Sequence, residues 1–135
     1  MTNLNECYCI NLRTAARRVS GSYNATFKPL GINVAQYSML RRINRYHKLS
    51  ITKVGEVCEL DRSTAGRNLK VLEKMGLVTF TSAKDRREMS VSLSVKGLDI
   101  LEKGNILWVQ AQKNMEDKLG GEENANHLLA LLKTL

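Results

Sequence analysis

Residues 60–78 constrain the possible folds most strongly, because they describe a helix with a defined beginning and a defined end. Asp61 is a residue type that caps helix N-termini, and Gly76 suits the left-handed position that ends a helix. Small and aliphatic residues recur at helical spacing from Ala65 to Leu72, so one face of this helix is expected to be buried. A short helix and a tight turn before it, and a β-hairpin after it, predict a helix-turn-helix unit with a wing.

Three helices are expected before the helix at 62–75. The first runs from Asn5, which can act as its N-cap, to about Phe27, because the proline at position 29 removes an amide donor and restricts the residue before it. A second helix is expected at 33–46, and a third, short one after Ser50, which can cap it. The apolar face of the first helix consists of Leu4, Tyr8, Leu12, Ala15, Val19, Tyr23 and Phe27.

The residues that follow predict a hairpin and two further helices. Residues 77–81 and 89–93 alternate in polarity as strands do, and the charged residues between them form a turn. Ser94 can cap a long helix that reaches about Leu119, where two glycines interrupt it. A last helix then follows. Its apolar face consists of Ala125, Leu128, Leu129, Leu132 and Leu135.

The whole chain, 1–135, is therefore expected to be one domain that is mainly α with a small β-hairpin wing. Residues 33–93 form the winged helix-turn-helix, and residues 1–30 and 95–135 supply flanking helices. These flanking helices carry more apolar surface than a monomer of this size needs to cover its core. We interpret them as dimerisation helices. The alternative is that their apolar faces cover the core of the same chain.

The charge of the chain favours a polyanionic partner. The formal net charge is +8 and the isoelectric point is near 9.6. Nucleic acid is the expected partner, although many small proteins are basic without binding it. No apolar run approaches the roughly 18 residues of a membrane span, and the N-terminus lacks the pattern of a signal peptide, so we expect no membrane partner and a cytoplasmic protein.

Catalytic and metal-binding motifs are absent from the sequence. It contains no phosphate-binding loop, nucleophile elbow or paired-histidine metal motif, so we expect neither an enzyme nor a cofactor. His47 and His127 are isolated, and the three cysteines have neither zinc-site spacing nor the number needed for a disulfide framework.

The polar face of the central helix is the candidate DNA-binding surface. A helix fits the major groove, and its first residues usually approach the base edges. Arg67 has the forked geometry that recognises guanine, whereas Lys70 and Lys74 are better placed for phosphates. Asn68 can read adenine or make a bond within the protein. The candidate DNA-contacting residues are Arg62, Ser63, Thr64, Arg67, Asn68, Lys70 and Lys74 on the helix and Lys84, Asp85, Arg86 and Arg87 at the hairpin tip.

Two features of this surface need separate explanations. The arginines of the hairpin tip suit the minor groove, which attracts cations where A·T-rich sequence narrows it. Asp85 is expected to hold a neighbouring guanidinium in position. Gly66 costs roughly 0.5–1 kcal/mol relative to alanine inside a helix. Close approach of the sugar-phosphate backbone and tolerated sequence drift both explain it, and the sequence does not decide between them.

Several motifs at these positions resemble the MarR family of bacterial transcriptional regulators. Residues 60–67 and 72–78 look like its recognition helix, and residues 85–97 look like its wing and the helix start that follows. Residues 29–32 with Gln36-Tyr37 are similar to its first turn between helices. The resemblance implies a triangular dimer of winged helices on a pseudo-palindrome, with Arg87 in the minor groove and Asp85 as its orienter. Gly66 departs from the family, which often has threonine or another side chain there.

The signal that controls such a regulator has two candidates. The first is a small aromatic or lipophilic molecule held where the dimerisation helices meet the DNA-binding part, as in many members of the family. An aromatic wall with a cation for a carboxylate suits such a ligand. The candidate residues are Arg17, Tyr23, Tyr37, Arg41 and Trp108, each of which can instead be a core or solvated residue.

The second candidate signal is oxidation of Cys7 or Cys9, which are expected in the first turn of the opening helix, where a helix N-terminus favours the thiolate. Cys9 stands at the same distance before Gln36-Tyr37 as the sensing cysteine of the organic-hydroperoxide branch of the family. Tyr23 matches a tyrosine of that branch, whereas Arg13 and Val34 occupy the places of others. Cys7 and Cys9 are two residues apart on a helix and point to different sides, so we expect no disulfide between them. A disulfide with the partner subunit stays possible.

These observations predict a homodimeric, sequence-specific repressor of pseudo-palindromic promoter sites on double-stranded DNA, released by a small aromatic or lipophilic ligand. A thiol-based redox regulator that uses Cys9 or Cys7 is the alternative within the same fold. A non-specific architectural DNA-binding protein is a further alternative, which short polar residues at the start of the central helix disfavour.

Overall fold

The computed structural model describes residues 3–82 and 89–135, and its elements follow the predicted order. The candidate residues at 84–87 lie outside the described residues. The elements are a 3₁₀ turn at Leu4–Glu6, α1 (Tyr8–Phe27), a 3₁₀ turn at Lys28–Leu30, α2 (Val34–Tyr46), β1 (Leu49–Ser50), α3 (Ile51–Cys58), α4 (Arg62–Lys74), β2 (Val78–Ser82), β3 (Met89–Leu93), α5 (Val95–Lys118) and α6 (Glu122–Leu132).

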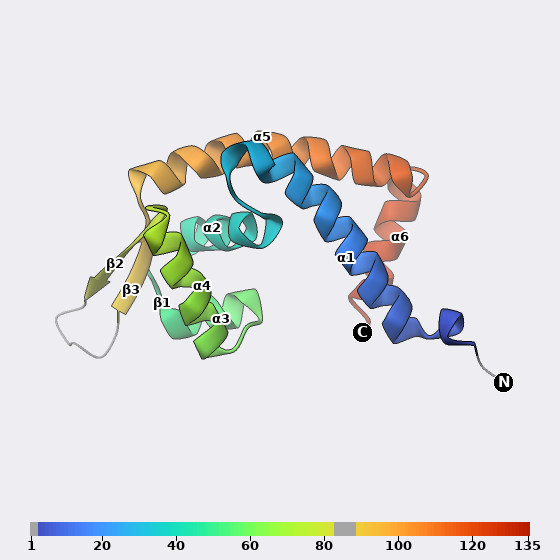
Figure 1. The fold of residues 1–135 in the computed structure, drawn as a ribbon, viewed down its shortest axis with the longest axis horizontal. Helices are drawn as coiled ribbons and strands as arrows, with labels where there is room; N and C mark the ends of the chain where they lie inside the picture. Colours follow the sequence, from blue (N-terminus) through green and yellow to red (C-terminus); the bar gives the residue numbers. More distant parts are fainter. Residues whose placement is uncertain (1–2, 83–88) are drawn as a thin grey trace.

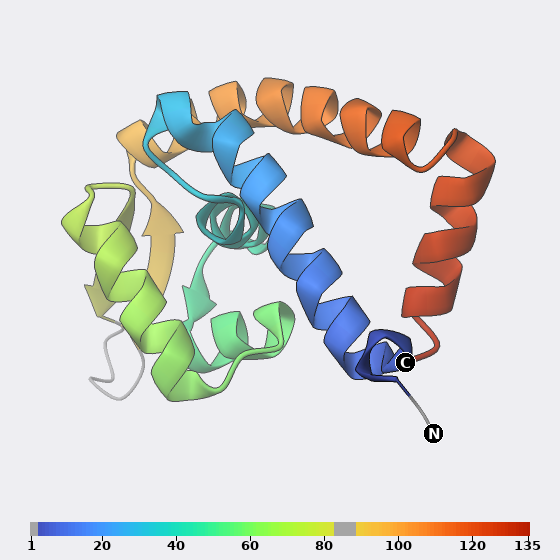
Figure 2. The same ribbon diagram turned by 45° about the vertical axis from the view of Figure 1, so that its right-hand side comes forward.

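The elements separate into two ends. In Figure 1, α5 runs along the top of the molecule, and α1 and α2 pack beneath it. Helices α3 and α4 lie together with the β-hairpin at one end, whereas α6 folds back from the far end of α5. The start of α1 and the C-terminus lie on the side away from strands β2 and β3 (Figures 1 and 2). The helix-turn-helix and wing therefore form one end, and the terminal helices form the other. This arrangement confirms the predicted winged helix-turn-helix flanked by helices.

Four helix starts predicted from single polar residues are confirmed. The side chains of Asn33, Ser50, Asp61 and Ser94 each accept a hydrogen bond from the backbone N–H three residues later, at 2.8 to 3.1 Å. Each bond satisfies one of the amide donors that a helix leaves free at its first turn. Gly76 has φ +77°, as the predicted left-handed end of α4 requires.

The predicted start of the first helix is wrong by two residues, because Cys7 and not Asn5 is in the capping position. The Asn3 side chain accepts from the Asn5 amide at 3.1 Å, and this bond closes a separate 3₁₀ turn. Helix α1 then begins at Tyr8, with Cys7 in the capping position and no side-chain bond from it. The side-chain amide of Asn11 donates to the backbone carbonyls of Asn5 and Cys7 and so joins the turn to the helix.

The hairpin belongs to a three-stranded sheet of order β1-β3-β2, and the sequence did not reveal β1. Leu49 pairs with Val91 in an antiparallel ladder, and Val91 also faces Phe80 on the other side. Strand β2 begins at Val78, one residue later than predicted. Helix α6 ends at Leu132, so the predicted final position of its apolar face, at residue 135, lies beyond the helix.

The core lies where α1, α2, α4 and the sheet meet beneath α5. The rings of Phe27 and Tyr37 stack with their centroids 4.7 Å apart, and both side chains are buried. The other fully buried large side chains are Leu40, Ile43, Val54, Leu69, Leu72, Leu77, Val78 and Val91. These residues come from α2, α3, α4, the sheet and, for Leu77, the turn between α4 and β2, so the helix-turn-helix end carries most of the core.

The terminal helices leave apolar surface uncovered. On α1, the predicted apolar face is buried only toward its C-terminal end, and Tyr8 and Leu12 are 86% and 42% exposed. Leu129 and Leu132 of α6 are also largely exposed. Among the described residues, no helix is long and apolar enough to cross a membrane.

Candidate nucleic-acid interface

The turn between α3 and α4 sets the angle of the candidate DNA-binding helix. The Leu60 amide donates to the Gly55 carbonyl at 2.8 Å, and Glu59 takes a left-handed conformation with φ +54°. A β-carbon on Gly55 would lie 2.9 Å from the Leu60 carbonyl oxygen. The turn therefore closes tightly against α3, and Asp61 follows directly as the cap of α4.

The Asp61 carboxylate organises the start of α4. It accepts from the Thr64 amide, the Ser63 hydroxyl and the Thr64 hydroxyl, each at 2.8 Å. These bonds, the backbone bond first, lower the pKa of Asp61 to about 2. An ionised carboxylate can only accept, so both hydroxyl protons point toward Asp61. Ser63 and Thr64 therefore present lone pairs outward, which suits amino groups on base edges better than phosphate oxygens.

Thr64 also holds the predicted guanine-reading residue. The Arg67 Nη2 atom donates to the Thr64 hydroxyl oxygen at 3.2 Å. Asp61, Thr64 and Arg67 thus form a continuous chain of hydrogen bonds at the surface of the first turns of α4. A guanidinium held in this way loses less side-chain freedom on binding than a free one.

The exposed face of α4 agrees with the sequence prediction. Ala65, Leu69 and Leu72 are buried. The side chains predicted to contact DNA lie on the other side, with Thr64 half-buried; the exposed ones are Arg62, Ser63, Arg67, Asn68, Lys70 and Lys74. Arg62 donates to the Thr52 hydroxyl of α3 at 3.3 Å, a contact that the sequence did not indicate. The two helices are thereby joined at the edge of this face.

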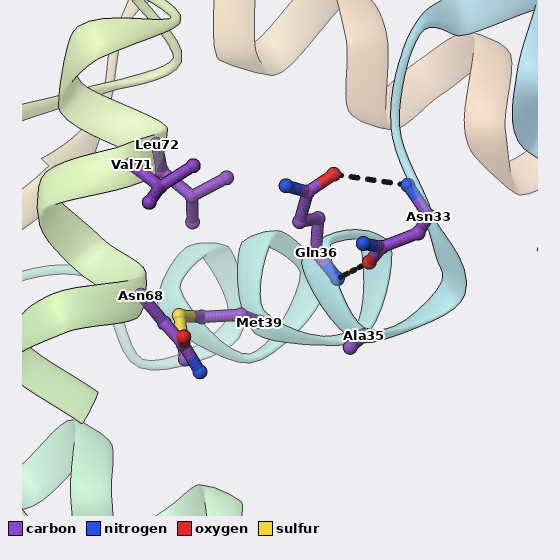
Figure 3. Close-up of a pocket in the computed structure, with 7 residues that line it drawn as sticks. All are labelled: Asn33, Ala35, Gln36, Met39, Asn68, Val71 and Leu72. Carbon is purple, nitrogen blue, oxygen red and sulfur yellow. Dashed lines mark hydrogen bonds between the residues drawn. The ribbon is translucent and has the colours of Figure 1, made fainter. Parts of the chain in front are cut away.

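Asn68 lies at the border between α4 and α2. It lines a small groove of about 150 Å³ together with Val71, Gln36 and Met39, which Figure 3 shows in close-up. The Asn68 side chain forms no hydrogen bond with any residue that the structure describes. The structure thus supplies no bond within the protein for Asn68 and leaves its amide available at the exposed face.

Hairpin β2–β3 stands next to α4, as Figure 1 shows. Its ladder runs from Val78 opposite Leu93 to Ser82 opposite Met89. Candidate residues Lys84, Asp85, Arg86 and Arg87 belong to that tip, outside the described residues. Their placement in the minor groove stays a prediction.

Three of the five candidate ligand-binding residues come together at the contact of α2 with α5. The Arg41 guanidinium lies 4.5 Å from the centre of the Trp108 ring and donates to the Tyr37 hydroxyl at 3.4 Å. That hydroxyl donates to Asn105 Oδ1 at 2.5 Å. Burial raises the pKa of Tyr37. Asn105 was missed, although its position four residues after Leu101 places it on the inner face of α5.

The other two candidates lie elsewhere on α1. The Tyr23 hydroxyl donates to the Gln112 side chain of α5, and burial raises the pKa of Tyr23. Arg17 is exposed and bonds to Thr14. A hollow of about 290 Å³ between α1 and α5 is lined by other residues, among them Arg18 and Met115. Tyr23 therefore bonds to α5 one helical turn beyond Trp108, whereas Tyr37 and Arg41 bond to each other on α2.

The cysteines are free thiols at separate places. Cys7 is half-buried and Cys9 is exposed at the beginning of α1, whereas Cys58 is half-buried at the end of α3. Tyr23 lies fourteen residues after Cys9 on the same helix, which corresponds to roughly 21 Å along the axis. Within one chain, these two side chains therefore cannot touch. Within residues 3–82 and 89–135, no group of His, Cys, Asp and Glu side chains could hold a metal ion.

Comparison with known proteins agrees with this geometry. A model of the MarR family matches residues 30–88. The organic hydroperoxide resistance transcriptional regulator of Bacillus subtilis (strain 168) is 30% identical over 133 residues, covering 94% of this chain and 88% of that protein. Among solved structures, the M. tuberculosis transcriptional regulator MosR in complex with DNA has 28% identity and a TM-score of 0.81, covering 94% of this chain and 93% of that one.

A further solved structure has the same fold over nearly the whole chain. The transcriptional repressor CouR bound to a 23-mer DNA duplex has 26% identity and a TM-score of 0.87, covering 97% of this chain and 93% of that one. Family model, relative and structures agree with the predicted recognition helix and wing. The chain belongs to the MarR family of winged helix-turn-helix transcriptional regulators and is a DNA-binding regulator, as predicted, not an enzyme.

Proposed function

We propose that the protein is a homodimeric repressor that binds pseudo-palindromic promoter sites in the cytoplasm. The observation that carries this proposal is the exposed face of α4, where the bonds from Asp61 through Thr64 to Arg67 position a guanidinium beside five further exposed polar or cationic side chains. MosR and CouR, both more than 25% identical to this chain, have been solved in complex with DNA.

Each side chain of the surface has a proposed role. Arg67 contacts guanine in the major groove, and the lone pairs of Ser63 and Thr64 accept from base amino groups. Lys70 and Lys74 bind phosphates. Arg62, Asn68 and Lys84 extend the contact on either side. At the hairpin tip, Arg87 enters the minor groove with Arg86 beside it, and Asp85 orients the inserted guanidinium.

The second copy of the chain is proposed to cover the apolar faces of the terminal helices. Exposed residues of α1, α5 and α6 form this surface, among them Tyr8 and Ile106, at 86% and 74% exposed, and Leu132. Monomeric proteins rarely leave such large apolar patches in water. A dimer through residues 1–30 and 95–135 would place two recognition helices at a fixed separation, which a pseudo-palindrome reads.

Selection of bound sequences from random duplex DNA tests the proposal, followed by two substitutions. Arg67→Ala should relax preference at one base pair of each half-site, and Arg87→Ala should weaken binding without changing the major-groove preference. Lys103→Ala is a control, because Lys103 pairs with Asp99 on α5, away from this face. Binding of both arginine variants like wild type at fixed salt would contradict the assignment.

Release by a small aromatic acid is the proposed switch. Arg41 is exposed, stacks on Trp108 and lies beside the Tyr37 hydroxyl, so a carboxylate with an aromatic ring has a cation and a flat surface to bind. Helix α2 also packs on α3 of the DNA-binding end, which gives a ligand there a route to α4. Titration of the DNA complex with benzoate and cinnamate tests this, with Arg41→Ala expected to abolish release and Arg17→Ala to leave it intact.

A thiol switch at Cys9 is the second candidate, and one observation favours it. The 30% identical relative in Bacillus subtilis is an organic hydroperoxide resistance regulator, and Cys9 of this chain is exposed. In the proposed reaction, the Cys9 thiolate attacks the peroxide, the O–O bond breaks, and a sulfenic acid and an alcohol form. Cumene hydroperoxide should then release DNA from wild type and from Cys58→Ser but not from Cys9→Ser. Cys7→Ser shows whether the neighbouring thiol takes part. A complex that ignores the peroxide excludes this switch.

A further inference from the structure

Gly66 is the glycine of α4, and none of the residues that the structure describes requires a glycine there. A β-carbon built on Gly55, Gly97 or Gly104 would lie less than 3.0 Å from another residue of the protein, so packing explains these three helical glycines. A β-carbon on Gly66 would meet only the Ile51 Cγ2 atom, at 4.0 Å, which is ordinary van der Waals contact. The backbone of Gly66 is helical, and its φ does not favour glycine.

Alanine at position 66 would therefore fit the chain and favour the helix. Glycine is the weakest helix former after proline, because it loses the most backbone freedom on folding. Position 66 of the recognition helix can therefore accept alanine, yet it carries glycine, which stabilises a helix less than any residue except proline. Contacts among the described residues do not explain why position 66 is glycine. Either a partner outside the chain requires glycine there, or nothing does.

The place of Gly66 on the helix indicates which outside partner is involved. Gly66 follows Arg62 by one turn and precedes Lys70 by one turn, and both of these cations are exposed. The three residues form one row along the helix surface, about 12 Å long. Ile51 is the nearest neighbour of Gly66, and Arg62 bonds to Thr52, so this row borders α3. The base-reading residue Arg67 lies on the adjacent part of the face.

We propose that the row Arg62–Gly66–Lys70 is the binding site of one DNA strand. The sugar-phosphate backbone of that strand lies directly against the helix at Gly66. The two cations hold phosphates on either side of Gly66, and a side chain at 66, such as the threonine often found there in the family, would keep the strand farther from both. This inference rests on the proposed binding to duplex DNA and deepens it, because it assigns a residue that controls the distance between protein and backbone.

An interaction with the DNA backbone has a different consequence from an interaction with a base. Phosphates carry no sequence information, so disruption of this backbone contact weakens binding to every duplex by a similar factor. It also reduces the salt dependence of binding, by about one in the slope of log K against log salt for each phosphate that the protein no longer neutralises. If Gly66 lay against a base instead, substitution there would change the preference at one position of the site.

The test uses Gly66→Ala and Gly66→Leu in the full chain, with Gly21→Ala as the matched control. Gly21 is an exposed glycine inside α1, and a β-carbon there would meet nothing within 4 Å. Binding is measured by titration at several salt concentrations, on the duplex selected by the wild type and on a random-sequence duplex. Thermal unfolding and size-exclusion chromatography report stability and oligomeric state.

We expect Gly66→Ala and Gly21→Ala to raise the midpoint of thermal unfolding alike. Only the substitution at 66 should weaken DNA binding, by roughly tenfold on both duplexes, which corresponds to the loss of one charge-assisted hydrogen bond of about 1.4 kcal/mol. Leucine should weaken it further. The salt slope should fall for the variants at 66 and stay unchanged for Gly21→Ala.

Two results would overturn the inference. If Gly66→Ala is more stable but binds both duplexes with wild-type affinity and salt slope, Gly66 has no role in binding. If only the selected duplex is bound more weakly, Gly66 borders a base edge and not the backbone. Failure of the proposed specific regulator is a separate result, seen when the wild type itself shows no preference for the selected duplex over the random one.

Discussion

Gly97 of α5 lies so close to Leu77 that a β-carbon at position 97 would stand 2.0 Å from the Leu77 carbonyl oxygen. That carbonyl also accepts the Ser94 amide at 3.0 Å, and the Ser94 hydroxyl donates to the Gly76 carbonyl at 2.5 Å. The start of α5 is therefore bonded directly to the end of the recognition helix. These bonds fix the position of α5 relative to the end of α4.

Substitution of Gly97 by alanine should damage this corner. No flexible side chain can move away, because the close approach is to a backbone carbonyl, so α5 must shift or the bonds from Ser94 must break. We expect the free energy of unfolding to fall by about 3 kcal/mol, at the upper end for overpacked sites. Urea denaturation measures it. Gly21→Ala, in open space, should instead raise the free energy of unfolding by about 0.5–1 kcal/mol. Equal changes for Gly21→Ala and Gly97→Ala would show that the close approach to Leu77 is unimportant.

The cap at Asp61 should make stability depend on acid pH. Its folded pKa, about 2, is below the ordinary value of 3.8, so its contribution is fully present above 3.8 and is lost as pH falls toward 2. Asp61→Asn keeps an acceptor for the Thr64 amide but has no charge to protonate. The difference in thermal midpoint between wild type and Asp61→Asn should therefore shrink between about pH 5 and about pH 2. A constant difference would show that the carboxylate charge is unimportant.

Removal of the Thr64 hydroxyl should loosen Arg67 without unfolding α4. Valine keeps the shape of threonine but cannot bond to Asp61 or accept from Arg67. We expect the ratio of affinities for the selected and random duplexes to fall about fivefold, the equivalent of one hydrogen bond of about 1 kcal/mol. Thr64→Ser retains the hydroxyl and should retain the ratio. Wild-type discrimination by Thr64→Val would mean that Arg67 needs no support from this residue.

The bond between Tyr37 and Asn105 should contribute to the stability of the α2–α5 contact. Tyr37→Phe removes a hydroxyl that donates at 2.5 Å, and we expect the free energy of unfolding to fall by about 1 kcal/mol. A double-mutant cycle with Asn105→Ala should give a coupling energy of similar size. Tyr46→Phe serves as control, since Tyr46 is 48% exposed. A coupling energy near zero would show that the two side chains act independently.

Local physics explains which parts of the fold were predictable. The caps at Asn33, Ser50, Asp61 and Ser94 act on the residue three positions later, so nothing distant is needed to identify them. Strand β1 was missed because two residues cannot show alternation, and its existence depends on pairing with β3 some forty residues away. The start of α1 was misplaced because Asn3, and not Asn5, caps the first turn, and that turn is a separate 3₁₀ turn at Leu4–Glu6.

The candidate site divides in the same way. Helical periodicity alone placed Arg67, Lys70 and Lys74 on the exposed face of α4, and the family resemblance was confirmed by the comparisons. Periodicity could not show that Asp61 holds the hydroxyl protons of Ser63 and Thr64, since that depends on the rotamers in the folded turn. Nor could it show that Tyr23 bonds to Gln112 while Arg41 bonds to Tyr37, because that requires the packing of α1 and α2 against α5.

The amino-acid sequence by itself determined the order of the helices, the hairpin and the face of α4 that meets solvent, because spacing, caps and turn residues act over a few positions. Only the tertiary structure decided what each glycine is for. Gly97 and Gly66 both stand inside helices and look alike in the sequence. The Leu77 carbonyl lies against Gly97, whereas a β-carbon on Gly66 would meet only the Ile51 Cγ2 atom, at ordinary contact distance. That difference exists only once segments distant in the chain are packed together.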